Sequence, residues 1–214
     1  MLRKYAMQTC FLVGAASNAV RIAPQAGDFV IAADGGYDHL VRWGIVPDMI
    51  VGDIDSLQSA LPENISHTIS PAEKDDTDMA LAFWEGHRRG FRHFVLVGAN
   101  SNERPDHTMA NLQLLVKAAA LGATAIMQDE TWQATAIHGP GELHLSGTGT
   151  VSVFAYGEQA TGVTIAGMKY DISNATLFGN RPLGVSNELA DRGTVSVAQG
   201  TLLVYALAGV QFYK

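Results

Sequence analysis

Residues 29–56 read FVIAADGGYDHLVRWGIVPDMIVGDIDS, and this stretch decides the expected fold. Its two short apolar runs, residues 29–33 and 49–51, are strand candidates, and the segment 36–43 between them is a helix candidate. Each apolar run leads into glycine and acidic residues, which are typical of loops at strand ends. A strand, a helix and a second strand in succession predict two parallel strands in an α/β layer.

The same alternation continues on both sides of this stretch. In the helix candidate 104–121, apolar residues from Met109 to Ala119 recur at helical spacing, and Gly122 follows as a stop signal. The pattern predicts an α/β domain, residues 1–132, with a mostly parallel sheet. Its other strand candidates are residues 10–13, 67–69, 94–97 and 125–127, and its other helix candidate is 76–89.

The residue composition of the sequence changes after about residue 131. Threonine, valine and glycine dominate, and turn signals such as Gly139-Pro140-Gly141 recur at short intervals. Regular turns without helical patterns predict an antiparallel all-β sandwich or barrel in the C-terminal domain, residues 133–214. Its strand candidates are residues 150–156, 162–165, 194–198 and 202–207.

Composition excludes several classes of protein. The chain has 214 residues, is 47% hydrophobic and 16% charged, and carries a formal net charge of −7. This apolar content excludes intrinsic disorder, and the acidic balance argues against a duplex nucleic-acid binder. Cys10 is the single cysteine, so no intramolecular disulfide can form, and no apolar run has the length of a membrane helix. We expect a cytoplasmic protein that contacts neither nucleic acid nor membrane.

The negative charge is concentrated in residues 34–78, which hold ten acidic and two basic residues. One interpretation is loop chemistry, because aspartate favours turns and helix N-caps, and Asp75 stands where it could cap a helix containing Asp78. The other interpretation is a cation site. Asp53 and Asp55 follow one apolar run and Asp34 follows the other, and ligands bind beyond the carboxyl ends of parallel strands. Carboxylates this close repel one another unless a cation offsets them, and Mg²⁺ is typically held by carboxylates together with substrate phosphates.

The sequence lacks the motifs of other common nucleotide-binding, zinc-binding and hydrolase sites. The sequence has neither the P-loop pattern nor a G-x-G-x-x-G turn after a strand. Its seven histidines and one cysteine show no zinc-ligand spacing, and no G-x-S-x-G elbow marks a serine hydrolase.

The order of the acidic motifs resembles that of the thiamine pyrophosphokinase family. The resemblance spans nearly the whole chain, and its G-D-x-D-S and D-x-T-D blocks are specific in combination. It is carried by Asp34-Gly35-Gly36, Pro47-Asp48, Gly52-Asp53-Ile54-Asp55-Ser56, Lys74-Asp75-Asp76-Thr77-Asp78, Gly98-Ala99, Arg104, Asp106-His107, Asn111, Gly167-Met168-Lys169-Tyr170 and Ser186-Asn187.

The resemblance implies an N-terminal α/β domain, a C-terminal all-β sandwich domain and a homodimer with active sites at the subunit interface. It also implies the reaction of ATP and thiamine to AMP and thiamine diphosphate with Mg²⁺. It implies that Asp53, Asp55 and Asp78 are catalytic and hold the metal, and that Tyr170, Ser186 and Asn187 bind thiamine. Asp55 or Asp78 would accept the proton of the thiamine hydroxyl. The implied nucleotide-binding residues are Asp34, Gly35, Gly36, Ser56, Lys74, Asp75, Thr77, Arg104, Asp106 and His107.

Two departures from the family pattern stand out. Residues 100–105, NSNERP, replace the glycine pair and arginine that relatives often carry, and Tyr170 stands where some relatives have tryptophan. Without the resemblance, Tyr170 also fits an ordinary strand aromatic, Ser186-Asn187 a turn, and His107 a helix-start histidine. Two other functions stay open: another Mg²⁺-dependent nucleotide phosphotransferase or hydrolase, and a non-catalytic sensor of nucleotide or thiamine.

Overall fold

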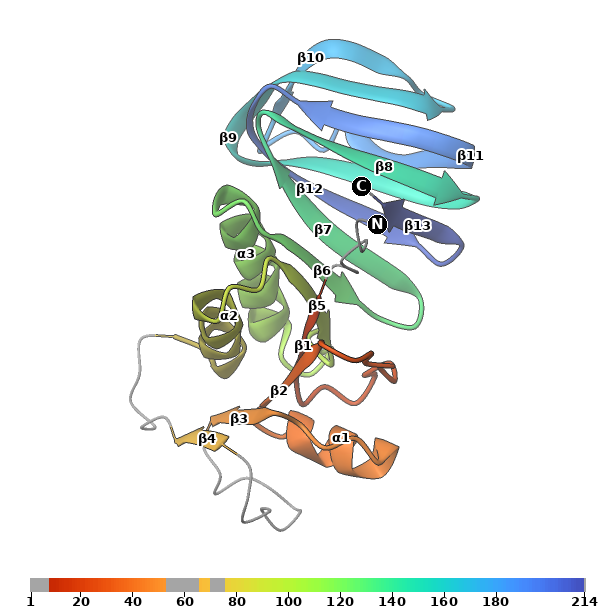
Figure 1. Cartoon of the computed structure of the whole chain (residues 1–214). Helices are drawn as coiled ribbons and strands as arrows, with labels where there is room; N and C mark the ends of the chain where they lie inside the picture. The colour runs from red at the N-terminus through yellow and green to blue at the C-terminus, as the bar shows by residue number, and fades with distance from the viewer. Residues whose placement is uncertain (1–7, 53–65, 70–75, 214) are drawn as a thin grey trace, which may run out of the picture. The chain divides into compact units, whose positions relative to one another are not determined.

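The structure is a computed structural model that describes residues 8–52, 66–69 and 76–213. The chain divides into two compact units, and the colours of Figure 1 follow it through both of them. The first unit comprises residues 1–114 and 127–130, and the second comprises residues 115–126 and 131–214. The predicted domain division at 132/133 stays a prediction.

The first unit is built on a parallel sheet, in the order β5-β1-β2-β3-β4. Every pair along this order is parallel, for example Cys10 opposite Phe29 and Cys10 opposite Phe94. The predicted α/β unit with parallel strands is confirmed. Its elements are β1 (Cys10–Val13), β2 (Phe29–Ala33), α1 (Gly36–Trp43), β3 (Met49–Gly52), β4 (Ser66–Ile69), α2 (Asp78–Arg88) and β5 (His93–Val97). The two elements that follow, α3 (Pro105–Ala120) and β6 (Thr124–Gln128), each contain residues of both units.

Helices cover both faces of strand β1. Val13 packs in one cluster with Leu40 of α1, and Cys10 faces α2, where a Cβ on Gly86 would lie 2.7 Å from its Sγ. Gly36 begins α1 so close to β1 that a Cβ there would lie 1.8 Å from the Val13 carbonyl oxygen. A strand buried on both faces needs apolar residues throughout, which explains the unbroken apolar run at residues 10–13.

Helix α3 differs from its prediction at one position. Met109 was expected on the apolar face, but 55% of it is exposed. The buried face is formed instead by Asn111, Leu112, Leu114, Leu115 and Ala118. Met109 therefore lies outside the buried face, and apolar character alone could not show this.

The second unit consists mainly of antiparallel strand pairs around its own core. β12 pairs with both β7 and β9, β8 with β11 and β13, and β10 with β9. The two strands predicted at 150–156 and 162–165 form one continuous strand, β9. Antiparallel strands are confirmed, and the finer assignment to a sandwich stays a prediction. The strands are β7 (Trp132–His138), β8 (Gly141–Gly147), β9 (Gly149–Met168), β10 (Ile172–Phe178), β11 (Gly184–Val197), β12 (Gln199–Leu207) and β13 (Val210–Tyr213).

Within the described ranges, each helix is too short or too polar to cross a membrane.

The burial of Cys10 gives a direct test of the α/β core. Burial raises the pKa of its thiol to about 12, so that at pH 8 only about one thiol in ten thousand is the reactive thiolate. We expect a thiol reagent such as Ellman's reagent to modify the folded protein at least a hundredfold more slowly than the urea-unfolded chain. Equal rates would show that β1 is not buried between helices.

Candidate functional site

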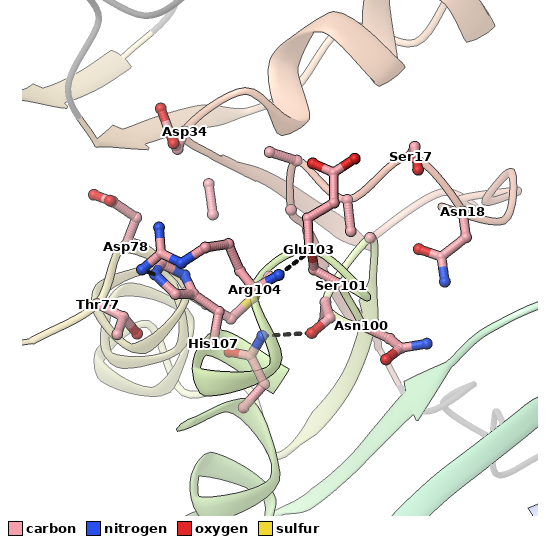
Figure 2. A pocket seen from close by; sticks show the side chains of 18 of the residues that line it. Ser17, Asn18, Asp34, Thr77, Asp78, Asn100, Ser101, Glu103, Arg104 and His107 are labelled. Atoms are coloured by element: carbon pink, nitrogen blue, oxygen red, sulfur yellow. Dashed lines mark hydrogen bonds between the residues drawn. The ribbon is translucent and has the colours of Figure 1, made fainter. Parts of the chain in front are cut away.

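A pocket of about 780 Å³ opens in the α/β unit beyond the carboxyl ends of β1, β2 and β5. The starts of α2 and α3 complete its wall (Figure 2). This is the edge of a parallel sheet at which ligands bind, as the sequence predicted. The pocket is lined by Gly14, Ala15, Ala16, Ser17, Asn18, Ala33, Asp34, Asp76, Thr77, Asp78, Met79, Gly98, Ala99, Asn100, Ser101, Asn102, Glu103, Arg104, His107 and Asn111.

Asp34 leaves strand β2 in a left-handed conformation, with φ of +52°. Its backbone N–H donates to the Val51 carbonyl at 2.8 Å, which holds the turn against the last residues of β3. Few residues other than glycine adopt this conformation, and aspartate is one that tolerates it. The turn places the half-buried Asp34 side chain at the pocket, where Figure 2 shows it opposite Arg104.

Gly52, the last residue of β3, is the point where two acidic residues meet. A Cβ on this glycine would lie 3.0 Å from Oδ1 of Asp78 and 3.1 Å from the backbone nitrogen and Cα of Asp34. Its φ of +135° is itself a conformation that favours glycine. The ends of β2 and β3 and the start of α2 therefore converge, as expected for strand-end loops that share a site.

Thr77 caps helix α2, and this corrects one prediction. Its side-chain oxygen accepts a hydrogen bond from the Ala80 N–H at 3.2 Å, so the helix begins at Asp78 rather than Asp76. The predicted cap, Asp75, is wrong because the threonine one residue before the helix fills that role. The cap fixes the first turn of α2 and with it the Asp78 carboxylate.

Arg104, Asp106 and His107 form an exposed cluster at the start of α3. The Arg104 guanidinium donates to both carboxylate oxygens of Asp106, at 3.1 and 2.8 Å, and its Nη2 lies 2.5 Å from Nε2 of His107. The hydrogen bond from Arg104 lowers the pKa of Asp106 to about 2, so this carboxylate is charged throughout the neutral range. Arg104 and His107 line the pocket, whereas Asp106 acts on Arg104.

The loop after β5 is held by helix α3. The buried Asn111 donates to the Ala99 carbonyl at 2.7 Å, and the Thr108 hydroxyl accepts from the Ser101 N–H at 2.9 Å. The departure from the family pattern at 100–105 thus forms an ordered pocket wall.

Sequence reasoning missed the loop after β1, which contributes residues 14–18 to the lining. It also missed Asp129, whose carboxylate accepts from the side chains of Asn18 and Asn100. The one available signal was Gly14 directly after an apolar strand, followed by small residues. Asn18 and Asp129 are 111 positions apart and belong to no recognisable motif.

Several predicted site residues fall outside the described residues, and their roles stay predictions: Asp53, Asp55, Ser56, Lys74 and Asp75. Gly35 and Gly36 cap and begin α1 and do not line the pocket. In the part of the chain that is described, no cluster of three or more carboxylate, imidazole or thiolate groups is placed to hold a metal ion. Asp34 and Asp78 supply two carboxylates, which is the number that Mg²⁺ commonly takes from a protein when phosphates complete its shell.

The three predicted thiamine residues lie in the second unit. Asn187 is 5% exposed, and its amide makes a two-point contact with the backbone of Tyr170, accepting from its N–H at 3.0 Å and donating to its carbonyl at 2.8 Å. Tyr170 is 60% exposed, with the Lys169 ammonium 5.5 Å from its ring centroid. Ser186 has a φ of +59° and donates its N–H to Ser152 Oγ. Asn187 therefore fixes the backbone from which the Tyr170 ring projects.

The convergence at Gly52 is tested by adding a methyl group there. Gly52→Ala forces Cβ against Asp34 and Asp78 in addition to the strained backbone, and we expect it to lower the free energy of unfolding by about 2–4 kcal/mol. Gly90→Ala is the control, because its φ is +96° and nothing lies within 4 Å of the added Cβ. Urea unfolding should show a loss at least ~1 kcal/mol larger for Gly52→Ala than for the control. Equal losses would mean that the three residues do not meet.

Two family models match the chain. The model described as "Thiamin pyrophosphokinase, catalytic domain" matches residues 23–127, and "Thiamin pyrophosphokinase, vitamin B1 binding domain" matches residues 137–202. Thiamine pyrophosphokinase from Bacillus subtilis (strain 168) is 28% identical over 184 residues, which cover 81% of this chain and 85% of that protein.

Solved structures show the same fold. The crystal structure of thiamine pyrophosphokinase from Bacillus subtilis has a TM-score of 0.82 at 24% identity, and that of thiamin pyrophosphokinase from Geobacillus thermodenitrificans has 0.80 at 24%. Each comparison covers 94% of this chain and 98% of the other. Since the two family models together span most of the sequence, the chain belongs to the thiamin pyrophosphokinase family.

Proposed function

We propose that this protein transfers the diphosphoryl group of ATP to the hydroxyl of thiamine, giving thiamine diphosphate and AMP. The observation that carries the proposal is the meeting of Asp34 and Asp78 at Gly52, at the edge of a pocket in the catalytic unit. Two acidic residues that line one pocket favour a bound cation, and a polyphosphate brings one with it. Family membership supports thiamine as the acceptor.

The residues present fit Mg²⁺. Its preferred ligands are oxygens, and Asp34 and Asp78 provide carboxylate oxygens from two elements that converge on Gly52. Asp53 directly follows Gly52 in the sequence. We assign Asp53 and Asp55 to the same set of residues that hold the metal and the polyphosphate. When bound, the ion neutralises charge on the phosphate oxygens as the transfer proceeds.

The remaining pocket residues suit the nucleotide. The Arg104 guanidinium lies across the pocket from Asp34, and a planar cation of this kind binds phosphate oxygens in a two-point contact (Figure 2). Its hydrogen bonds to Asp106 hold it in one orientation before any ligand arrives. We assign Thr77, Arg104 and His107 to nucleotide contacts, with Asp106 orienting Arg104.

The transfer itself needs positioning and one proton acceptor. The thiamine hydroxyl oxygen forms a bond to the β-phosphorus, and the bond from that phosphorus to the α,β-bridging oxygen breaks, so that AMP leaves with the bridging oxygen. The hydroxyl proton passes to a carboxylate, Asp78 or Asp55. Asp78 is suited to this because the Thr77 cap fixes the helix turn that carries it.

Thiamine binding is assigned to Tyr170, Ser186 and Asn187. The exposed ring of Tyr170 offers a flat surface for a heterocycle, and Asn187 holds its backbone rigid. These residues lie in the second unit and the acidic pocket lies in the first. We therefore propose a homodimer in which the second unit of one chain contributes the thiamine-binding residues to the pocket of the other chain.

Product analysis of wild-type protein with ATP, Mg²⁺ and thiamine tests the reaction. The proposal predicts equal amounts of AMP and thiamine diphosphate, and no AMP when thiamine is omitted. AMP or ADP formed without thiamine would indicate a hydrolase, and ligand binding without turnover would indicate a sensor.

Removing the charge of Asp78 should slow turnover strongly and leave the fold intact. Asp78→Asn keeps the shape of the side chain and relieves repulsion, so we expect kcat to fall at least about a hundredfold while the melting temperature holds or rises slightly. The matched control is Glu158→Gln, which makes the same change at an exposed position in β9. Near-normal turnover with a collapsed melting temperature would make Asp78 a purely structural residue.

Loss of the Tyr170 ring should act on thiamine alone. Tyr170→Ala removes a stacking surface worth about 0.5–1.5 kcal/mol, so the KM for thiamine should rise about two- to tenfold and the KM for ATP should stay constant. Tyr170→Phe, which keeps the ring, should behave like wild type. At a thiamine concentration well below the wild-type KM, a mixture of Asp78→Asn and Tyr170→Ala protein should be more active than the sum of the two alone, because each hybrid dimer holds one intact site. An active species that sediments as a monomer would contradict the shared site.

A further inference from the structure

Asp129 connects two loops of the pocket without lining it. It follows β6 in the α/β unit, and its Oδ2 accepts hydrogen bonds from the side-chain amides of Asn18 and Asn100, the latter at 2.9 Å. Asn18 belongs to the loop after β1 and Asn100 to the loop after β5, and both line the pocket. Figure 2 shows the two asparagines on the same side of the pocket.

Backbone hydrogen bonds join the two loops at their base. The Gly14 N–H donates to the Val97 carbonyl at 2.8 Å, and the Ala16 N–H donates to the Gly98 carbonyl at 3.0 Å. Farther out, α3 holds one side of the β5 loop through Thr108 and Asn111. Asp129 holds the other side and is the group that ties Asn100 to Asn18.

The carboxylate also sets the direction of both amides. An ionised carboxylate only accepts hydrogen bonds, so the amide nitrogens of Asn18 and Asn100 must face Asp129 and their oxygens must point elsewhere. The Asn100 oxygen then faces the Thr108 hydroxyl, 3.5 Å away. One acceptor thus fixes the conformation of two side chains that line the pocket. Supporting residues outside a binding site commonly hold its side chains in this way.

We propose that Asp129 is a positioning residue for the nucleotide, acting through Asn18 and Asn100. The inference rests on the proposed function, which places the nucleotide in this pocket beside Arg104 and His107. With Asp129 in place the two loops meet the nucleotide in one arrangement. Without it the loops keep only the backbone bonds at their base, and ordering their outer residues again weakens nucleotide binding.

Three variants test the role. Asp129→Ala removes the acceptor, whereas Asp129→Asn keeps a carbonyl oxygen that can accept from both amides. Glu130→Ala is the control, because it removes the neighbouring exposed carboxylate. We expect Asp129→Ala to raise the KM for ATP at least tenfold and to leave the KM for thiamine within twofold. Asp129→Asn should stay within threefold of wild type for both, and Glu130→Ala should match wild type. Equal rises in both KM values, or an Asp129→Asn variant as impaired as Asp129→Ala, would overturn the proposal.

Hydrogen exchange on the protein without ligands gives a readout that does not depend on turnover. Asp129→Ala should speed amide exchange at least tenfold in residues 14–20 and 98–102 and leave α1 unchanged. The Asn18→Ala, Asn100→Ala double variant should reproduce this pattern. Unchanged exchange in both loops, or an equal increase that includes α1 in both variants, would overturn the role of Asp129. If wild-type protein forms no thiamine diphosphate, the proposed function fails, and the exchange experiment still decides whether Asp129 joins the loops.

Discussion

The close approach of Asp34, Gly52 and Asp78 is the constraint on which the pocket depends. Three chain segments meet around residue 52, where a Cβ would lie only 3.0 Å from Asp78 and 3.1 Å from Asp34. Asp34 reaches this point through a left-handed turn, a conformation that costs on the order of 1–3 kcal/mol, and Asp78 through a helix start that Thr77 caps. The local chain therefore accepts strain to bring two acidic residues to one edge of the pocket, where the proposed cation with its polyphosphate would offset their charge.

Much of this arrangement could be predicted from the sequence, because it is encoded locally. Buried parallel strands must be apolar throughout, so the runs at residues 10–13 and 29–33 predicted β1 and β2 with their observed bounds. Strand-end loops lie at one edge of a parallel sheet, so Asp34 and Asp78 could be assigned to one site. The family resemblance added the reaction and the thiamine residues, which no local pattern contains.

The remaining features depend on contacts between distant residues. Asn18, Asn100 and Asp129 come from three separate loops, and no local pattern links them. Met109 is apolar at a helical position yet exposed, because the buried face of α3 is set by what packs against it. Asn187 looked like a turn residue or a ligand contact, and its hydrogen bonds to Tyr170 became visible only in three dimensions. Strands β7, β8, β10 and β13 were not predicted, although β8 alternates between polar and apolar residues from Glu142 to Ser146.

The central claim is that the carboxylates of Asp34 and Asp78 bind a polyphosphate through a divalent cation. The most direct measurement is calorimetric titration of wild-type protein with a non-hydrolysable ATP analogue, once with Mg²⁺ and once with EDTA. The account predicts binding at least tenfold tighter with Mg²⁺, because without the ion the phosphates meet the charges of Asp34 and Asp78 directly. Equal or tighter binding in EDTA would contradict it.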